Sequence, residues 1–569
     1  MMFLIPLLSA GNLLAARASS AAASVASQAS LDWRDLNVIV VTDVHSWVNG
    51  HHQKDYQTPR DADYGDLWSF HHFLSEEANR RQKDLFFVNN GDIVDGTGIS
   101  DGTTTKGEKL MPILKRIPFD LVNTGNHELY HDSGIGNINK PGGFADHFRG
   151  KYITSNVVNS TNGETLGLNY THLYGSATGR KYAAFGFLYN MMDHCDAVLV
   201  RRVQDTIALP WFSEALIGTN GSIIIAHMGY SDPLVSVILS KMRELRGIDY
   251  PVVFFTGHTH IRAYTPLDAN SVSFEAGHYF DTVGFLSLSF PDQESNISVE
   301  VRQIDANRET LAGLVGKNVQ NFKTSEGEQI KQQIKAVRKE LDLDRIVGCN
   351  PSYLDCQADT TWDLYINRVI PHMLNVTREK YFAILSKGGL RYNLWSGKVT
   401  WDDIIIFSPF MNKFVEIKGL NGSAIRLLKA LPIFSTYAVS NTSLINDVYY
   451  DFITQDFDLR TIQNVLTQHG YNFTVIGHFS GFDTTTVWRN YSELYWRCGG
   501  GDGGHGGSSG PDSISMTIIV AMIIFAALTI PFAFYIHKCV TRREKNRNNF
   551  RELLEEPEEE REISANSVL

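Results

Sequence analysis

The chain is poor in cysteine and has no excess of positive charge. Only 5 of its 569 residues are cysteine, so a structural zinc site built from thiolates is not expected. Acidic residues outnumber basic ones by 62 to 51, which gives a net charge of -11. Proteins that bind a nucleic-acid backbone usually present a basic face that releases counterions, so no nucleic-acid partner is expected and a small ligand is favoured.

The sequence also lacks internal repeats and the composition of a disordered chain. Hydrophobic residues make up 43% and charged residues 20% of the chain, as in ordinary globular proteins. A single hydrophobic core seldom serves more than about 250–300 residues. We therefore expect two globular domains with appended segments.

Both ends of the chain carry long apolar runs. Residues 1–18 contain an apolar stretch that ends in Ala-Arg-Ala, which predicts a secretory signal peptide; because no basic residue precedes the stretch, an uncleaved anchor is the alternative. Residues 514–536 hold no charge and, at about 1.5 Å per residue, would span a bilayer as a helix. A buried core helix is the alternative, but a basic cluster follows directly and predicts a cytosolic tail over 537–569.

We therefore expect a single-pass type I membrane protein whose domains face the lumen or the exterior, in a vacuole, an endosome or the cell surface. Nine N-glycosylation triplets agree with this topology, and all precede the membrane segment: Asn159, Asn169, Asn220, Asn296, Asn375, Asn421, Asn441, Asn472 and Asn490. Two disulfides are compatible with such a compartment, Cys349 with Cys356 and Cys195 with Cys498.

The chain between these ends divides into two α/β regions. Residues 33–305 alternate short apolar runs with polar or helical stretches, which predicts a layered α/β domain. Residues 306–341 predict a connecting helix, and residues 342–497 a second domain with strands at 403–407 and 414–418. Residues 498–513 are rich in Gly and Ser and predict a flexible linker.

Five apolar runs of the first region each end in residues that bind metals. The runs are 36–42, 85–90, 120–124, 222–226 and 252–256. They lead into the polar groups Asp43-Val-His45, Gly91-Asp92-Ile-Val-Asp95, Gly125-Asn126-His127-Glu128, His227 and Gly257-His258-Thr-His260. Because ligands of open α/β sheets bind outside the carboxyl ends of the strands, these five groups are expected to converge.

The local spacing of these groups supports convergence. Residues two apart in an extended segment point the same way, so Asp43 with His45 and His258 with His260 could each offer two ligand atoms. The glycines before Asp92, Asn126 and His258 allow tight turns, with positive φ if required. Imidazole, carboxylate and amide ligands together suit Zn, Mn or Fe better than Ca. Two divalent metal ions of undecided identity are the expected cofactors.

The ordered motifs D-x-H, G-D-x-x-D, G-N-H-E, a lone His and G-H-x-H resemble the calcineurin-like metallophosphoesterases over about residues 36–305. The resemblance implies an α/β/β/α sandwich that hydrolyses phosphate esters with metal-activated water. It implies one metal held by Asp43, His45, Asp92 and His260 and a second held by Asp92, Asn126, His227 and His258.

By the same resemblance His127 stays off the metals and acts on the substrate as the catalytic residue. Glu128 is the second catalytic candidate, because it could orient His127, although it could also only support the loop. The 5′-nucleotidase branch usually has an Asp three residues after this His, and Tyr130 stands there instead. The group that orients His127 is therefore left open.

The second region resembles, more weakly, the C-terminal domain of 5′-nucleotidases. Gly388-Gly-Leu-Arg391 is similar to a segment whose Arg meets the substrate, and Phe410 is similar to an aromatic that stacks on a base. A surface salt bridge and a core position are the alternatives for these two residues. The family's later stacking loop has no counterpart near residues 451–459, so nucleotides, nucleotide sugars and other phosphate esters all remain candidate substrates.

Three functions follow in order of preference. The first is a membrane-tethered phosphoesterase of the 5′-nucleotidase type. The second is a nucleotide-sugar diphosphatase or phosphodiesterase, and the third is a non-catalytic receptor or sorting protein that kept the fold.

Overall fold

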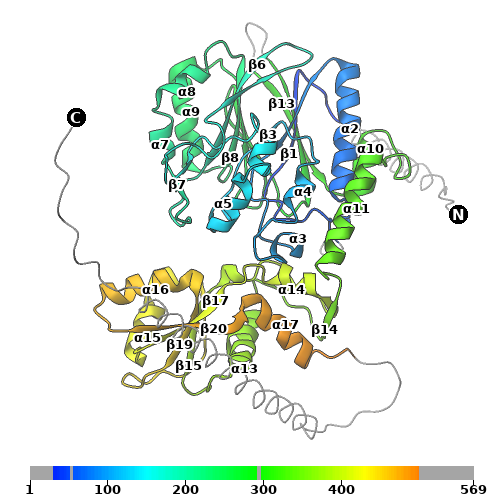
Figure 1. Cartoon of the computed structure of the whole chain (residues 1–569). Helices are drawn as coiled ribbons and strands as arrows, with labels where there is room; N and C mark the ends of the chain where they lie inside the picture. The colour runs from blue at the N-terminus through cyan, green and yellow to red at the C-terminus, as the bar shows by residue number, and fades with distance from the viewer. Residues whose placement is uncertain (1–29, 52–55, 291–295, 499–569) are drawn as a thin grey trace, which may run out of the picture. The chain divides into compact units, whose positions relative to one another are not determined.

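Two mixed β-sheets form the centre of the first domain. The computed structural model of the chain describes residues 30–51, 56–290 and 296–498 (Figure 1). The first sheet has strand order β13-β12-β1-β2-β3, and the second has strand order β10-β11-β9-β8-β6-β5. The first contains β1 (Leu36–Val41), β2 (Asp84–Asn89), β3 (Leu121–Val122), β12 (Thr282–Ser289) and β13 (Ser298–Asp305). The second contains β5 (Thr171–Tyr174), β6 (Lys181–Leu188), β8 (Gly221–His227), β9 (Val252–Thr256), β10 (Arg262–Asp268) and β11 (Ser271–Ala276).

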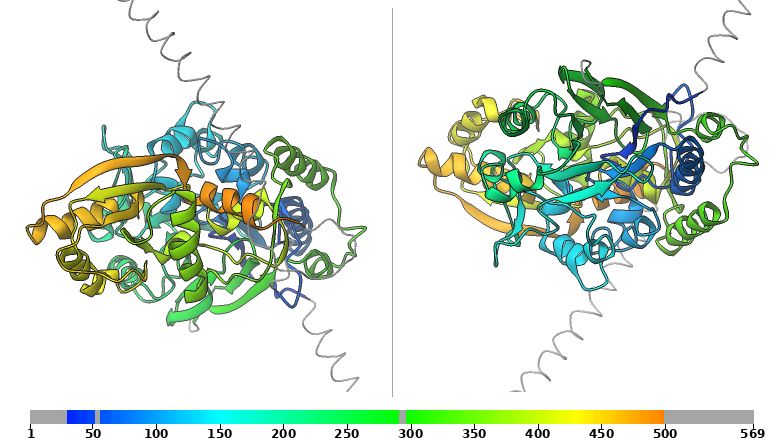
Figure 2. Two further views of the ribbon diagram at one scale, coloured as in Figure 1. Left: turned by 90° about the horizontal axis from the view of Figure 1, so that it is seen from below. Right: turned by 90° about the horizontal axis from the view of Figure 1, so that it is seen from above.

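The two sheets pack face to face and helices cover their outer faces. Val38 and Phe86 of the first sheet share one buried cluster with Ile223 and Phe255 of the second. In the view from above, α2 (Tyr64–Arg81) lies on one side of the strands and α9 (Pro233–Arg246) on the other (Figure 2). Burial on both faces explains why β1 and β8 are unbroken apolar runs rather than alternating ones. The predicted α/β/β/α layering is confirmed.

Short elements complete the first domain. They are α3 (Gly98–Asp101), α4 (Met111–Leu114), η1 (His127–Leu129), α5 (Asp132–Asn139), α6 (Phe144–His147), β4 (Val157–Asn159), β7 (Val198–Val200), α7 (Val203–Thr206) and α8 (Pro210–Ala215).

The segment predicted as one connecting helix over residues 306–341 is two helices. These are α10 (Arg308–Leu314) and α11 (Ser325–Glu340), and Gly316, with φ of +69°, lies in the break between them. Helix α11 packs closely on α2, because a Cβ atom added to Gly65 would lie only 2.2 Å from the carbonyl oxygen of Gly327. The two glycines thus allow the connecting helix to pack directly on the first domain.

The second domain has a five-stranded sheet of order β18-β15-β19-β17-β20 and a two-stranded sheet of β14 and β16. Their strands are β14 (Ile346–Asn350), β15 (Tyr381–Ser386), β16 (Gly397–Thr400), β17 (Lys413–Lys418), β18 (Tyr437–Val439), β19 (Asp451–Gln455) and β20 (Thr474–Asp483). The helical elements are α12 (Asp359–Leu364), η2 (Tyr365–Val369), α13 (Ile370–Met373), η3 (Lys387–Gly389), α14 (Trp401–Phe407), α15 (Gly422–Ala430), η4 (Pro432–Phe434), α16 (Asp456–Gln468) and α17 (Thr484–Tyr495). The predicted strand at 414–418 is confirmed as β17.

The strand predicted over residues 403–407 is wrong, because these residues belong to helix α14. Thr400 caps the helix: its side chain accepts a hydrogen bond from the backbone of Asp403, and the Asp403 carboxylate accepts one from the backbone of Thr400. This reciprocal capping box starts a helix at residues whose Ile-Ile-Ile run alone favours a strand.

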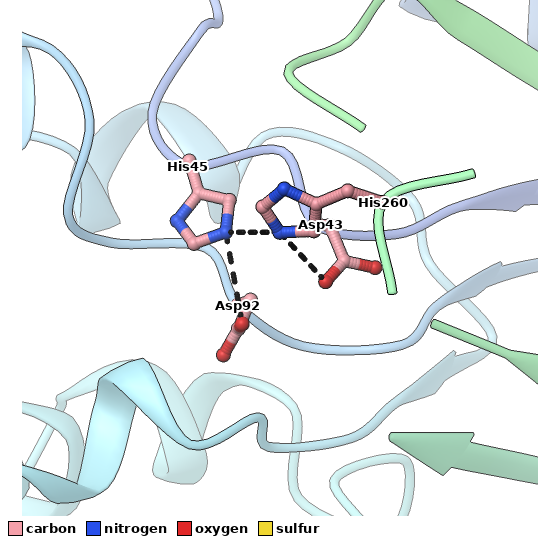
Figure 3. Close-up of side chains that lie close together, drawn as sticks. All are labelled: Asp43, His45, Asp92 and His260. Atoms are coloured by element: carbon pink, nitrogen blue, oxygen red, sulfur yellow. Dashed lines mark hydrogen bonds and ion pairs between the residues drawn. The ribbon is translucent and has the colours of Figure 1, made fainter. Parts of the chain in front are cut away.

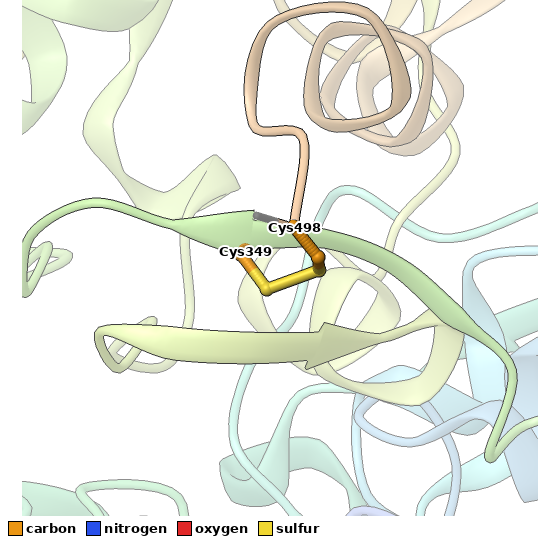
Figure 4. Close-up of a disulfide and its surroundings, with 2 residues drawn as sticks. All are labelled: Cys349 and Cys498. Carbon is orange, nitrogen blue, oxygen red and sulfur yellow. A yellow bond between two sulfur atoms is a disulfide. The ribbon is translucent and has the colours of Figure 1, made fainter. Parts of the chain in front are cut away.

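Both predicted disulfide pairings are wrong. Cys349 pairs with Cys498 (Figure 4), while Cys195 and Cys356 are free thiols. The end of the second domain returns beside β14, where the backbone amide of Cys349 donates to the carbonyl of Trp496 at 2.6 Å. Sequence spacing cannot reveal this approach, because the two cysteines are 149 residues apart.

Several predicted segments lie outside the described residues. These are the signal peptide at 1–18, the linker beyond Cys498, the membrane helix at 514–536 and the tail at 537–569. Among the helices of the described ranges, none has the length and apolar character needed to cross a membrane.

Candidate active site

Seven predicted metal ligands come together at the carboxyl ends of five strands. Asp43 and His45 follow β1, Asp92 follows β2, and Asn126 follows β3. His227 is the last residue of β8, and His258 and His260 follow β9. Asp43, His45, Asp92 and His227 are buried almost completely, whereas His258 is exposed at the rim.

The carboxylate and imidazole atoms form two overlapping groups. Asp43, His45, Asp92 and His260 place one ligand atom each within 4.8 Å of one another, as do Asp92, His227 and His258. In the first group the Nε2 atoms of His45 and His260 lie 3.2 Å apart (Figure 3). In the second, Nε2 of His227 lies 3.1 Å from Oδ2 of Asp92. Asp92 therefore faces both groups, as a bridging ligand must.

Left-handed backbone, rather than extended backbone, directs these side chains to one point. Asp43, His45, Asp92, His258 and His260 have φ values of 50°, 46°, 49°, 77° and 61°. Non-glycine residues in this region cost about 1–3 kcal/mol each, so the surrounding fold must hold them there. The expectation that the D-x-H and H-x-H pairs converge through extended geometry was wrong; tight turns bring them together.

The neighbouring glycines are required mainly by close packing. Gly91 has φ of +85°, but Gly125 and Gly257 do not adopt positive φ. A Cβ atom on Gly125 would lie 2.1 Å from Oδ1 of Asp92, and one on Gly257 would lie 2.5 Å from Oδ2 of Asp43. These glycines leave room for the carboxylates.

The donor atoms fit divalent cations. Nδ1 of His45 donates to the carbonyls of Val94 and Asp95 at 2.9 Å, and Nδ1 of His227 donates to the carbonyl of Asn90 at 2.9 Å. Each imidazole is thereby oriented with its Nε2 facing the cluster, an arrangement typical of histidine ligands. The side-chain oxygen Oδ1 of Asn126 is buried without a hydrogen-bond partner among the described residues. An unpaired oxygen in a buried polar cluster fits the role of a metal ligand.

Burial and charge set the protonation of this cluster. Burial lowers the pKa of His45 and of His260 well below the ordinary value, so both imidazoles are neutral and free to bind. Burial, together with the Asp92 carboxylate, raises the pKa of Asp43 to about 7. For His227 burial works in the opposite direction, but Asp92 and Asp43 outweigh it and raise the pKa to about 10.

His127 is oriented by Asp95. Nδ1 of His127 lies 2.8 Å from Oδ2 of Asp95, whose other oxygen contacts Lys106. Although burial opposes it, the charges of Lys106 and His127 hold the pKa of Asp95 below its usual range. The orienting residue that the sequence left open is thus the second Asp of the G-D-x-x-D motif, which the sequence analysis had named without giving it a role.

Glu128 holds the loop that carries Asp92. Its carboxylate accepts four backbone hydrogen bonds, from the N–H groups of Asp92, Ile93, Val94 and Gly125 at 2.9, 2.8, 3.2 and 2.8 Å. Both oxygens are therefore used to hold the loop that carries Asp92. These contacts fit the alternative that Glu128 supports the loop, and its catalytic role stays a prediction.

The second domain contributes two predicted residues to the same region. Nε and Nη2 of Arg391 are buried and have no hydrogen-bond partner in the described part of the chain. The guanidinium also hydrogen-bonds with Tyr279, a residue that the sequence analysis did not single out. The ring of Phe410 stacks 5.8 Å from that of His127 and lies 5.6 Å from the Arg391 guanidinium. The alternatives of a surface salt bridge and a core phenylalanine do not fit these contacts.

A further aromatic residue faces this region from the second domain. Phe457, at the start of α16, is 57% exposed, and its ring lies 6.3 Å from that of Tyr130. No sequence motif marked it, because its position depends on how α16 lies against the first domain.

Residues 36–262 match the family of calcineurin-like phosphoesterases. The chain carries a calcineurin-like phosphoesterase domain. Residues 357–457, within the second domain, match the C-terminal domain of NAD nucleotidase. The order of these two matches agrees with the order of the two domains in the structure, and the metal-binding motifs lie inside the first match.

Two related proteins align with most of this chain. An uncharacterised protein of Schizosaccharomyces pombe is 28% identical over 425 residues, which cover 68% of this chain and 70% of that protein. A protein of Arthroderma benhamiae named only as secreted is 27% identical over 460 residues, covering 70% of this chain and 68% of its own.

Among solved structures, a 5′-nucleotidase from Candida albicans is similar with a TM-score of 0.73 and 24% identity, covering 82% of this chain and 99% of that one. A 5′-nucleotidase precursor from Thermus thermophilus is similar with a TM-score of 0.60 and 16% identity, covering 82% and 98%. These likenesses establish that the two domains share the fold of those proteins.

Proposed function

We propose that this phosphoester hydrolase is a two-metal enzyme that releases phosphate from nucleotides. The observation that carries the proposal is Arg391, whose buried guanidinium leaves two nitrogen atoms without partners among the described residues, beside the metal-ligand cluster. A guanidinium is costly to bury unpaired, and its forked N–H groups match a phosphate. The charge of Arg391 contributes to lowering the pKa of His45 and of His260, which places it within electrostatic reach of the first ligand group.

The ligand roles follow from the two groups of side chains. Asp43, His45, Asp92 and His260 would hold one cation; Asp92, Asn126, His227 and His258 would hold the other. When bound, two divalent cations supply Lewis acidity that polarises a phosphoryl group and makes water a nucleophile near neutral pH. The mixed nitrogen and oxygen donors suit Zn, Mn or Fe.

The residues around the cations have separate tasks. Arg391 binds phosphoryl oxygens and holds the ester in place. His127, with Nδ1 bonded to Asp95, presents Nε2 and either stabilises the charge on the phosphoryl oxygens or gives a proton to the leaving oxygen. Phe410 and Phe457 offer two aromatic faces for a nucleobase, which is why nucleotides are preferred over simple phosphate esters.

A second candidate is cleavage of the pyrophosphate in a dinucleotide. The match of residues 357–457 to the C-terminal domain of NAD nucleotidase favours it. Nucleotide sugars contain the same pyrophosphate linkage, so they are tested in the same experiment.

The experiment is hydrolysis of AMP, NAD, a nucleotide sugar and bis-p-nitrophenyl phosphate by the purified protein supplied with Mn or Zn. Asp92→Asn removes one charge from the bridging position. Asp120→Asn is the matched control, because Asp120 precedes β3 at the opposite end from Asn126 and its carboxylate accepts only from backbone and lysine groups.

Phosphate release from AMP that is lost in Asp92→Asn and kept in Asp120→Asn is the expected result. Cleavage of NAD or the nucleotide sugar without release from AMP would move the function to the second candidate. A metal-loaded protein that is inert on all four substrates would overturn the enzymatic proposal and favour a binding or sorting role.

We also propose that the two domains work in an oxidising compartment, the lumen or the exterior, tethered through the apolar run at 514–536. The disulfide between Cys349 and Cys498 and the secreted relative support this location. None of the nine glycosylation asparagines is buried, which supports their modification by glycans. Glycosidase treatment of the protein from a eukaryotic host should lower its apparent mass; an unchanged mass would contradict a lumenal or exterior location.

A further inference from the structure

Tyr130 lies where the second ligand group meets His127. It stands at the position where the nucleotidase resemblance leads one to expect an Asp. Its hydroxyl is 3.0 Å from Nδ2 of Asn126, and its ring meets the edge of the His127 ring at 5.3 Å. Because Asp95 already orients His127, position 130 is free for another task.

The hydrogen bond to Tyr130 fixes the direction of the Asn126 amide. A carboxamide has one donor end and one acceptor end, and only the oxygen can bind a cation. Nδ2 of Asn126 is used by Tyr130, while Oδ1 is buried and has no partner among the described residues. A flipped amide would turn its N–H groups toward the cluster and remove one ligand.

Tyr130 also connects to the histidines of the same group. Its hydroxyl hydrogen-bonds with Tyr189, whose ring lies 4.6 Å from the ring of His258. The backbone amide of Tyr189 donates to the carbonyl of His227 at 3.2 Å. The Tyr130 oxygen accepts the hydrogen bond from Nδ2 of Asn126.

We propose that Tyr130 is a positioning residue of the second metal site, which holds the Asn126 side-chain oxygen toward the cation shared with Asp92, His227 and His258. The inference rests on the proposed two-metal site. Asp95 orients His127, and Tyr130, at the position where an Asp is expected, orients Asn126. Loss of the Tyr130 hydroxyl should therefore weaken the second cation selectively.

The test is a binding isotherm of Mn²⁺ on the intact chain, with free Mn²⁺ measured by electron paramagnetic resonance. Wild type should bind two ions. Tyr130→Phe should bind the first ion unchanged and the second about tenfold or more weakly, the usual loss when a partner of a metal ligand is removed.

Tyr250→Phe is the matched control. It also removes a buried phenol oxygen with side-chain partners, Thr219 at 2.7 Å and Ser222 at 2.8 Å, but at the opposite end of β8 from His227. It should bind both ions as wild type does.

A double-mutant cycle separates positioning from general loosening. If Tyr130 acts through Asn126, then Tyr130→Phe should add nothing to the loss caused by Asn126→Ala. Additive losses, equal weakening of both ions, or unchanged binding in Tyr130→Phe would each overturn the inference. Wild type that binds fewer than two ions would overturn it together with the two-metal site. Wild type that binds two ions but hydrolyses no substrate would overturn only the proposed function.

Discussion

Replacing Glu128 by Gln tests whether this residue supports the loop or acts in catalysis. The Glu128 side chain is 4% exposed, and each of its oxygens accepts two backbone hydrogen bonds. Oε1 accepts from Ile93 and Val94, and Oε2 accepts from Asp92 and Gly125. A glutamine offers one oxygen and one amino group in the same space.

The expected cost follows from this pairing. Whichever way the amide of the glutamine lies, two backbone N–H groups face another donor and lose their acceptor. A buried donor without a partner costs about 1–3 kcal/mol, so the free energy of unfolding should fall by about 2–6 kcal/mol. Relief of the buried charge offsets part of this, because burial and the Asp92 carboxylate raise the pKa of Glu128.

The assay combines thermal unfolding with activity at a temperature where the variant is folded. At about 2–4 °C per kcal/mol, Tm should fall by about 4 °C or more. Glu214→Gln, on the exposed surface of α8, is the control and should leave Tm nearly unchanged. If Glu128→Gln keeps the wild-type Tm but loses most of kcat, the supporting role is refuted and Glu128 acts in catalysis instead.

Three further predictions follow from contacts around the site and at the chain end. Asp95→Asn should lower kcat on AMP about 100-fold but spare p-nitrophenyl phosphate, whose leaving group needs no proton from His127; equal losses on both would refute this role. Because Asp92 and Asp43 raise the pKa of His227 to about 10, metal binding must displace its proton at neutral pH. Metal affinity should therefore rise with pH across the neutral range, by up to about tenfold per unit. Calorimetry in buffers of different ionisation heat measures the released proton, and identical heats would contradict its release. Cys498→Ser should lower the free energy of unfolding by about 2–5 kcal/mol, and non-reducing peptide mapping should recover Cys349 joined to Cys498 rather than to another cysteine.

The sequence indicated the strands and the ligand types for a clear physical reason. Strands buried on both faces are apolar along their whole length, so β1 and β8 stand out from the polar residues that follow them. Metal ligands must be Asp, His or Asn, and they fall at the strand ends, where parallel strands present one edge. The α14 helix was predicted wrongly because its Ile-Ile-Ile run outweighed the Thr400 capping box in a short segment.

Other features depend on contacts between residues far apart in the chain. The partner of His127 could have been any nearby acid, and only the fold places Asp95 within 2.8 Å of it. No motif marks Phe457, and only the fold brings its ring near Tyr130. Only the fold also shows that the Glu128 carboxylate accepts hydrogen bonds from a loop more than thirty positions earlier.

By itself, the sequence determined the layered α/β class, the strand ends and the set of candidate metal ligands, because each of these depends on local residue type and spacing. Only the tertiary structure decided how the ligands converge, which acid orients His127, where Arg391 lies and which cysteines pair. These depend on left-handed turns and on approaches across the fold, such as that of Cys349 to Cys498 over 149 residues. Local patterns carry no information about such distances, because the packing of the whole chain sets them.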